Sequence, residues 1–313
     1  MLLACALDRW IGDPRWCLHP VVVMGWCIAR LRPLAEGWAA QRPWRLRAAG
    51  VAITLLLVLG SGAAGWALVA GVGQLPAGSL AWWLGQGLVV IALASALAGR
   101  SLNQAVQGVL TTMASGDRPA ARQRLAWIVG RDTDDLDQAE ILRALAETAS
   151  ENAVDGLFAP LFWMLVGAAL GQPLALAWAF KAASTLDSML GYRTGTLRWL
   201  GTAGARLDDL LVWIPCRLVA LGLGQLGPAL ADGAADPSPN AGVSQAAYAH
   251  AAAVQLGGDN RYGGVVRRKP LLHAGAAPAD AAAVQHMLRL TRRQALLWQL
   301  IGGLVVFITK ALS

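Results

Sequence analysis

The sequence predicts an all-α, polytopic integral membrane protein with about four to five membrane helices, some of them broken or re-entrant. Of the 313 residues, 56% are hydrophobic and only 14% are charged, which is more apolar surface than a soluble domain of this size needs to bury. Several apolar stretches approach the roughly 20 residues that a helical membrane span requires. Arginine clusters flank these stretches, which is typical of loops on the cytoplasmic side of a membrane.

Five apolar stretches are the expected membrane segments. The first two predict a hairpin, and the last predicts an uninterrupted C-terminal helix. The third is interrupted by "GQP" at Gly171 to Pro173, and the fourth contains Pro215 and Arg217. Broken segments of this kind are tolerated in a membrane only where protein or water satisfies the freed backbone groups. The five stretches are residues 48–74, 80–98, 157–180, 210–231 and 295–312.

We expect one membrane-embedded domain over residues 1–313, multi-pass in the cell inner (cytoplasmic) membrane, with polar helical and loop regions between the spans. The bias of Arg and Lys toward certain loops sets the expected orientation, but the side on which residues 181–209 lie stays open. The predicted parts are a basic interfacial segment (1–47), a membrane hairpin (48–98), a polar helical region (99–156), broken membrane segments (157–231) with a polar insert (181–209), a polar loop region (232–294) and a C-terminal membrane helix (295–312).

Several functions are disfavoured by the same sequence. The excess of basic residues is not interleaved with aromatics in any nucleic-acid recognition motif, so we expect no nucleic-acid partner. Two stretches, "GSGAAG" and "GLGQLG", spell G-x-G-x-x-G, but both lie inside predicted spans, where glycine favours close helix packing over dinucleotide binding. The spacing of the four cysteines indicates neither a zinc site nor a disulfide framework.

Polar chemistry is concentrated between Asp117 and Asp155, which hold nine of the 19 acidic residues. Most of these acids belong to one predicted helix opened by "GRDTDDLDQAE". We expect Asp132 to cap its N-terminus, with the next aspartates in the first turns, where the helix dipole favours negative charge.

The later acids need another explanation. Glu140, Glu147, Glu151 and Asp155 are spaced so that all four lie within about 80° on one helix face. Like charges on neighbouring turns repel each other unless a cation or substrate lies among them, and Arg143 is positioned to pair with Glu147 or Glu140. A solvated stripe is the alternative. The stripe runs into an apolar segment, however, where ionisable groups are usually functional.

Three further clusters bring carboxylates and cations to or beside membrane segments. Carboxylates can bind a metal ion and guanidinium groups can bind phosphate, so together these clusters provide the groups that a phosphate-binding site needs. The clusters lie in "LDRWIGDPRWCLHP", "FKAASTLDSMLGYR" and "ARLDDLLVWIPCR".

Motifs along nearly the whole chain resemble the CobD/CbiB family of cobalamin biosynthesis. They are "DRWIGDPRWCLHPVVVMG", "GRDTDDLDQAEILRALAETASENAVDGLFAPLFW", "KAASTLDSMLGYR", "ARLDDLLVWIPCRL" and "SPNAGVSQAAYAHAAAVQLGGDNRYGG", in that order. The resemblance implies an adenosylcobinamide-phosphate synthase. Such an enzyme joins the propionate carboxylate of adenosylcobyric acid to the amine of (R)-1-amino-2-propanol O-2-phosphate as an amide. The resemblance also implies ATP as the energy source, with Mg²⁺, and a corrinoid as substrate.

The resemblance and the polar clusters together assign candidate roles. The candidates for taking the proton from the attacking ammonium, or for holding a metal, are Glu147, Glu151, Asn152 and Asp155. The candidates for binding substrate or phosphate are Asp13, Arg15, His19, Arg131, Lys181, Arg193, Arg206 and Asn240. The candidates for holding Mg²⁺ are Asp187, Asp208 and Asp209.

Some positions depart from the family pattern. Val22, Ser184 and Gln245 stand where Arg, Asn and Glu are frequent, so they are poor candidates for essential groups. The Gly257 to Gly264 loop could approach a substrate closely, although turn geometry alone also explains its glycines.

Two other functions stay open at this point. One is a membrane protein of the AmpE-like branch with a sensory or unknown role, although such a protein should lack the "GDPRW" and "SPNAG" motifs that are present here. The other is a transporter of corrinoids or other anions, suggested by broken helices that carry charges, although the spans show no evident inverted repeat. The expected partners are the two substrates and the lipid bilayer. A complex with other late enzymes of the pathway is compatible with the resemblance.

Overall fold

The computed structural model describes residues 1–12 and 19–312, which fold into two compact units. The first unit comprises Met1–Ala98, Ala159–Leu211 and Gln299–Ser313. The second comprises Gly99–Phe158 and Val212–Trp298. Two helices, α11 and α14, contribute to both units, and each unit is described by itself below.

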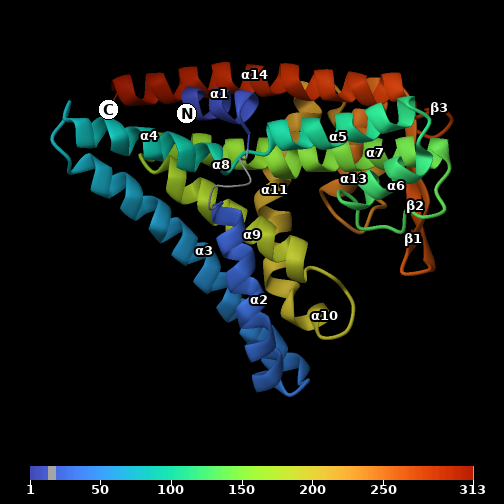
Figure 1. Cartoon of the computed structure of the whole chain (residues 1–313), viewed down its shortest axis with the longest axis horizontal. Coiled ribbons are helices and arrows are strands. Elements are labelled where there is room, and N and C mark those ends of the chain that lie inside the picture. The colour runs from blue at the N-terminus through green and yellow to red at the C-terminus, as the bar shows by residue number, and fades with distance from the viewer. Residues whose placement is uncertain (13–18, 313) are drawn as a thin grey trace. The chain divides into compact units, whose positions relative to one another are not determined.

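The first unit is entirely helical in its described part (Figure 1). Proline at the first helical position begins α2, α3 and α9, as expected because that position needs no backbone donor. Its helices are α1 (Leu2–Trp10), α2 (Pro20–Ala39), α3 (Pro43–Gly73), α4 (Leu80–Ala94), α8 (Ala159–Ala169), α9 (Pro173–Leu190) and α10 (Leu197–Leu200), with the first part of α11 (Thr202–Gly222) and the last part of α14 (Ala281–Leu312).

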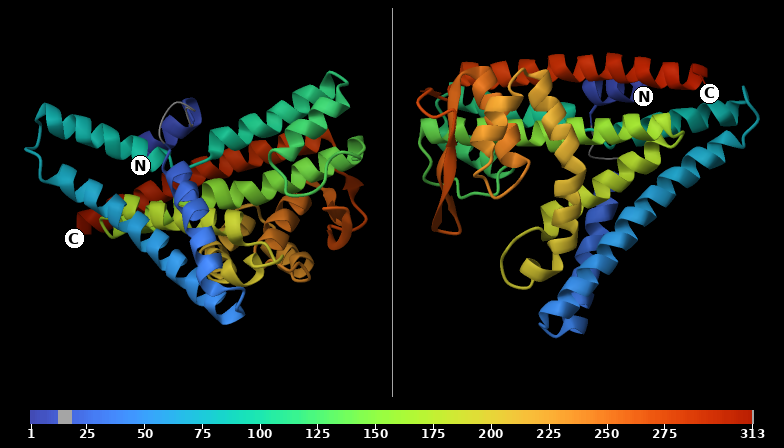
Figure 2. Two further views of the ribbon diagram at one scale, coloured as in Figure 1. Left: turned by 60° about the horizontal axis from the view of Figure 1, so that its bottom comes forward. Right: turned by 180° about the vertical axis from the view of Figure 1, so that it is seen from behind.

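The core of the first unit lies where α2, α3, α9 and α10 pack together, and α2 lies beside α3 in Figures 1 and 2. Glycine permits the closest approaches. A Cβ atom on Gly50 would lie 2.0 Å from the carbonyl oxygen of Leu200, and one on Gly65 would lie 2.9 Å from that of Leu174. The "GSGAAG" stretch therefore contributes to helix packing, as predicted. The expected break at "GQP" is also confirmed, because α8 ends before it and α9 begins at Pro173.

The second unit combines helices with a small sheet. Its helices are α5 (Gly99–Ala114), α6 (Arg118–Ala126), α7 (Gln138–Ala153) with a π-helical turn (Val154–Phe158), α12 (Leu226–Gly233) and α13 (Ala241–Ala252), together with the remainder of α11 and the beginning of α14. Its strands are β1 (Val254–Tyr262), β2 (Val265–Leu272) and β3 (Ala277–Pro278). β1 and β2 form the antiparallel hairpin that is seen clearly in the right-hand view of Figure 2, and β3 pairs with β1 in parallel.

The sheet corrects two predictions. The chain is mostly helical rather than all-α, and residues 232–294 form helices and strands rather than a loop region. The sequence signal for the hairpin is its pair of adjacent glycines. Gly263 and Gly264 form a two-residue turn with φ of 55° and 80°, between runs rich in Val, Arg and Tyr.

In the part of the chain that the structure describes, two helical segments are long and apolar enough to cross a membrane, Pro43–Gly73 and Gln138–Ala169. A third is obtained if Leu80–Ala94 and Gly99–Ala114 are counted as one broken span. A membrane protein is therefore plausible, but the expected four to five spans are not confirmed. The predicted fourth span is interrupted at Gly224, which has a φ of 72°, and α14 begins at Ala281 rather than near residue 295.

The N-terminus of α7 differs from the prediction in a way that affects the acidic residues. Asp137, not Asp132, caps the helix, and Asp137 and Glu140 form a reciprocal capping box. Asp132 instead accepts hydrogen bonds from the backbone amides of Gly263 and Gly264, which lower the pKa of its carboxyl group. The backbone amides of the hairpin turn are therefore bound by Asp132 of the same unit.

Candidate functional site

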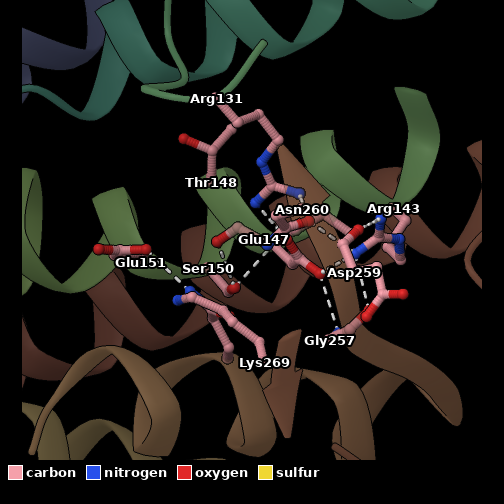
Figure 3. Close-up of polar contacts among 12 residues, drawn as sticks. Arg131, Arg143, Glu147, Thr148, Ser150, Glu151, Gly257, Asp259, Asn260 and Lys269 are labelled. Carbon is pink, nitrogen blue, oxygen red and sulfur yellow. Dashed lines mark hydrogen bonds and ion pairs between the residues drawn. The ribbon is translucent and has the colours of Figure 1, made fainter. Parts of the chain in front are cut away.

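The acidic stripe on α7 lies in the second unit. Glu147, in the middle of the stripe, has both carboxylate oxygens bound by hydrogen-bond donors. Glu147 is 1% exposed. Its Oε1 accepts hydrogen bonds from Arg143 at 3.1 Å and from the Gly257 amide at 2.9 Å, and its Oε2 is paired with Arg131. Figure 3 shows this carboxylate among the labelled polar groups. A buried carboxylate whose two oxygens are both bound by fixed donors has the geometry of a structural anchor.

The two arginines around Glu147 are held by further contacts. Asn260, 3% exposed on β1, accepts hydrogen bonds from Arg131 at 2.7 Å and from Arg143 at 3.0 Å. Arg143 also donates to the carbonyl oxygen of Gly257 at 2.7 Å. The network therefore fastens α7 to β1. The pairing of Arg143 with Glu147 was expected, and it is confirmed.

Glu151 lies one turn further along α7 in a different environment. Its Oε2 accepts a hydrogen bond of 2.8 Å from the side-chain amide of Gln245 on α13. Its Oε1 receives no hydrogen bond from any described residue, and the side chain is partly exposed. One oxygen is thus fixed and the other is available. This is the arrangement that a general base requires, because the acceptor must reach a proton on a substrate.

The remaining residues predicted to be catalytic do not continue this face. Asn152 is exposed and donates to the hydroxyl of Thr148 at 2.9 Å. Asp155 lies in the π-helical turn, where an extra residue per turn changes the angular register of α7. The uninterrupted α-helical stripe therefore ends at Glu151, and roles for Asn152 and Asp155 stay predictions.

The candidate substrate-binding residues are distributed over both units. Both terminal nitrogens of Arg131 are occupied by Asn260 and Glu147, and these contacts do not favour a role for Arg131 in phosphate binding. Asn240 is 5% exposed and accepts a hydrogen bond of 2.8 Å from Arg217. In the first unit, His19 caps α2 by accepting a hydrogen bond from the Val21 amide. Asp13 and Arg15 lie outside the described residues.

A second group of charges lies in the first unit, on α9, in the loop that follows it and on the first part of α11. Burial raises the pKa of Asp208 to about 8, and the neighbouring Asp187 and Asp209 add to this effect while Lys181 opposes it. Burial also raises the pKa of Asp209, with Arg193 opposing. Five candidates from separate sequence motifs are thereby brought into one neighbourhood: Lys181, Asp187, Arg193, Asp208 and Asp209.

Arg206 differs from this group. It is exposed, and no described residue forms a hydrogen bond or ion pair with it, so the expected alternative of a pair with Asp209 is not found.

Among the described residues, no three His, Cys, Asp or Glu side chains are placed to hold a metal ion by themselves. The three aspartates predicted to bind Mg²⁺ therefore do not form a complete site from protein groups alone. Mg²⁺ usually takes only one or two carboxylates together with substrate phosphates and water. Asp208 Oδ1 is buried and has no hydrogen-bond partner among the described residues, so an oxygen ligand of the kind that Mg²⁺ prefers is present.

Sequence reasoning missed the residues of β1, β2 and α13 that surround the stripe. Gln245, discounted as a departure from the family pattern, is 1% exposed and binds Glu151. Lys269 and Asp236 form an ion pair at 3.3 Å in the same unit. Their signal in the sequence is weak because each lies far along the chain from the acidic helix.

Comparison with known proteins agrees with the motifs. The family described as "CobD/Cbib protein" matches residues 1–291. A cobalamin biosynthesis protein CobD of Synechocystis sp. is 41% identical over 316 residues, covering 96% of this chain and 89% of the relative. The CobD protein of Pelobacter propionicus is 42% identical over 304 residues, covering 93% of this chain and 89% of the relative. The cobalamin biosynthesis protein CbiB of Salmonella arizonae is 38% identical over 281 residues, covering 86% of this chain and 84% of the relative.

No solved structure matches the chain. The family match extends over all the helices and strands that build the acidic site, and the relatives align along most of their own length. The chain belongs to the CobD/CbiB family of cobalamin biosynthesis proteins.

Proposed function

We propose that this protein is an amide-forming ligase that converts adenosylcobyric acid to adenosylcobinamide phosphate, with (R)-1-amino-2-propanol O-2-phosphate as the amine and ATP as the energy source. Membership of a cobalamin biosynthesis family supports a corrinoid substrate. The observation that carries the chemical assignment is the state of Glu151, which has one oxygen held by Gln245 and the other open.

The reaction defines what the site must do. An alkyl amine is protonated at neutral pH, as lysine is, so it must lose a proton before it can attack a carbonyl carbon. The substrate carboxylate must also have one oxygen converted into a leaving group, most simply as an acyl phosphate formed from ATP, with release of ADP and then phosphate. Glu151 is the proposed acceptor of the ammonium proton because its free oxygen can approach a substrate.

Mg²⁺ would accompany the nucleotide and neutralise phosphate charge. Asp208 is the proposed ligand, since its buried Oδ1 lacks a protein partner, and Asp187 and Asp209 lie in the same neighbourhood. Arg193 and Lys181 are the proposed phosphate-binding cations of that group. Arg206 has an exposed guanidinium that is available for the substrate phosphate.

The test uses the purified, detergent-solubilised protein with adenosylcobyric acid, aminopropanol phosphate and Mg-ATP, and follows the amide product by mass spectrometry. We expect product with wild type and none when ATP is omitted. Glu151→Gln should abolish product formation, whereas Glu140→Gln should retain it because Gln also serves the capping box. Absence of product from the folded wild-type protein would refute the proposal, and ATP-independent uptake of a corrinoid into proteoliposomes would favour a transporter.

A further inference from the structure

Two residues without a predicted role lie near the Glu151 carboxylate. Gln245 on α13 donates to its Oε2 at 2.8 Å, and Lys269 on β2 lies close enough for the two charges to interact. In Figure 3, Glu151 lies to one side of the Glu147 network, with Lys269 below it. Since Gln245 and Lys269 come from different elements, the environment of Glu151 is assembled only by the fold.

The placement of Gln245 is not explained by its own hydrogen bonding. The side chain is 1% exposed, and its amide oxygen has no hydrogen-bond partner among the described residues. A buried polar atom without a partner destabilises the folded protein, and an apolar residue of similar size would avoid that cost. The hydrogen bond that its amide nitrogen does make is to Glu151. The contact with Glu151 therefore accounts for the amide at this position.

Lys269 is held in a way that leaves Glu151 available. Its ammonium group pairs with Asp236 at 3.3 Å, and the two side chains are 24% and 3% exposed. Burial alone would lower the pKa of Lys269, but the carboxylates of Asp236 and Glu151 outweigh it and raise the pKa, so the lysine stays charged. Among the described residues, Lys269 forms its ion pair with Asp236 and none with Glu151. It therefore supplies positive charge near Glu151 without covering the free oxygen.

The two other carboxylates whose charges act on Glu151, those of Glu147 and Asp236, both have cationic partners. Glu147 is neutralised by Arg131 and Arg143, as described above. Asp236 is paired with Lys269, whereas Glu151 forms no ion pair with any described residue. The charge of Lys269 is thus shared between a close partner, Asp236, and a more distant one, Glu151.

We propose that Gln245 and Lys269 are positioning residues of the amide-forming site: Gln245 fixes the direction of the Glu151 carboxylate, and Lys269, held by Asp236, places a positive charge near it that favours the proton-accepting form. The inference rests on the proposed function, in which Glu151 is the base. It adds two residues that act through Glu151 and touch no reacting atom. Their loss should lower kcat and leave the KM values for both substrates nearly unchanged.

The kinetic test compares Lys269→Met with Lys269→Arg, and includes Gln245→Met. We expect Lys269→Met and Gln245→Met to lower kcat by about 10- to 100-fold, a share of the effect usual for general-base catalysis. Lys269→Arg should restore most of the rate because it restores the positive charge. Arg267→Met is the matched control, since Arg267 is an exposed cation on the same strand that stacks on Tyr262 and forms no ion pair with a described acid. Unchanged kcat in Lys269→Met, or an equal loss in Lys269→Arg, would overturn the proposal.

A second measurement does not depend on the reaction. A hydrophobic carbodiimide modifies carboxyl groups in their protonated form, and peptide mass spectrometry quantifies the modification at Glu151. At neutral pH, Lys269→Met should increase the labelling of Glu151 several-fold, whereas Lys269→Arg and Arg267→Met should label like wild type. Equal labelling in all four proteins would overturn the inference even if amide formation is confirmed. Increased labelling in a protein that forms no amide would refute the proposed function instead.

The Lys269→Met variant leaves Asp236 buried without its cation, which destabilises the folded protein. The Lys269→Met/Asp236→Asn double variant removes both charges and avoids that penalty. It should still show the fall in kcat and the increased labelling. A folded double variant with the wild-type kcat and the wild-type labelling of Glu151 would overturn the proposal.

Discussion

Replacing Glu147 by Gln should destabilise the second unit and leave the chemistry intact, whereas Glu151→Gln should do the reverse. Glu147, Arg131 and Arg143 have side chains that are 1%, 8% and 18% exposed. Removing one partner from a buried ion pair leaves an uncompensated charge and costs about 3 to 5 kcal/mol. Glutamine keeps an acceptor for the Gly257 amide, so the lower part of that range applies.

That free energy corresponds to a measurable change in thermal unfolding. Each kcal/mol shifts the unfolding midpoint of a domain of this size by about 2 to 4 °C, so we expect Glu147→Gln to lower the midpoint by about 6 to 12 °C. Tryptophan fluorescence of the purified protein in detergent can follow the transition. At a temperature where the variant is folded, the rate of amide formation should be close to that of wild type, while Glu151→Gln should unfold near the wild-type midpoint.

A double-mutant cycle with Arg143→Gln separates the pair from its surroundings. The two substitutions together should cost less than the sum of the single effects, because the second removes a charge that the first left unpaired. A Glu147→Gln protein with the wild-type midpoint would refute the anchoring role. A stable Glu147→Gln protein without activity would show that this carboxylate, too, takes part in the reaction.

Three other outcomes follow from single sites. Arg206→Met should raise the KM for aminopropanol phosphate by about 10- to 100-fold, at 1.4 kcal/mol per factor of ten, with little effect for unphosphorylated aminopropanol and no change in unfolding midpoint. Gly50→Ala should lower the midpoint because the new Cβ would lie 2.0 Å from a backbone oxygen of α10, whereas Gly60→Ala on the same helix meets nothing within 4 Å and should be tolerated. The amide of His273, with a neighbouring imidazole, lowers the pKa of Asp232. That stabilisation is present above the ordinary pKa of about 4 and is lost as pH falls through the lowered value, so Asp232→Asn should flatten acid unfolding below about pH 4.

The local features of this protein are predictable because they depend on residues close together in the chain. The helical content, the break at "GQP" and the pairing of Arg143 with Glu147 all involve separations of a few residues. Helical periodicity and turn residues can be recognised in the sequence without knowledge of the fold. The position of the α7 cap was predicted wrongly, because several aspartates in a row compete for the same role. The capping box of Asp137 and Glu140 decides between them.

The sequence by itself determined a mostly helical protein with apolar segments, an acidic stripe on one helix and membership of a cobalamin biosynthesis family. Only the tertiary structure decided that both oxygens of Glu147 are bound while one oxygen of Glu151 is left without a hydrogen bond. Glu147 is bound by the Gly257 amide, 110 residues away in the chain, and Glu151 by Gln245, 94 residues away. Helical spacing makes Glu147 and Glu151 equivalent, and the distinction arises because a buried carboxylate takes its character from the donors that the fold brings to it.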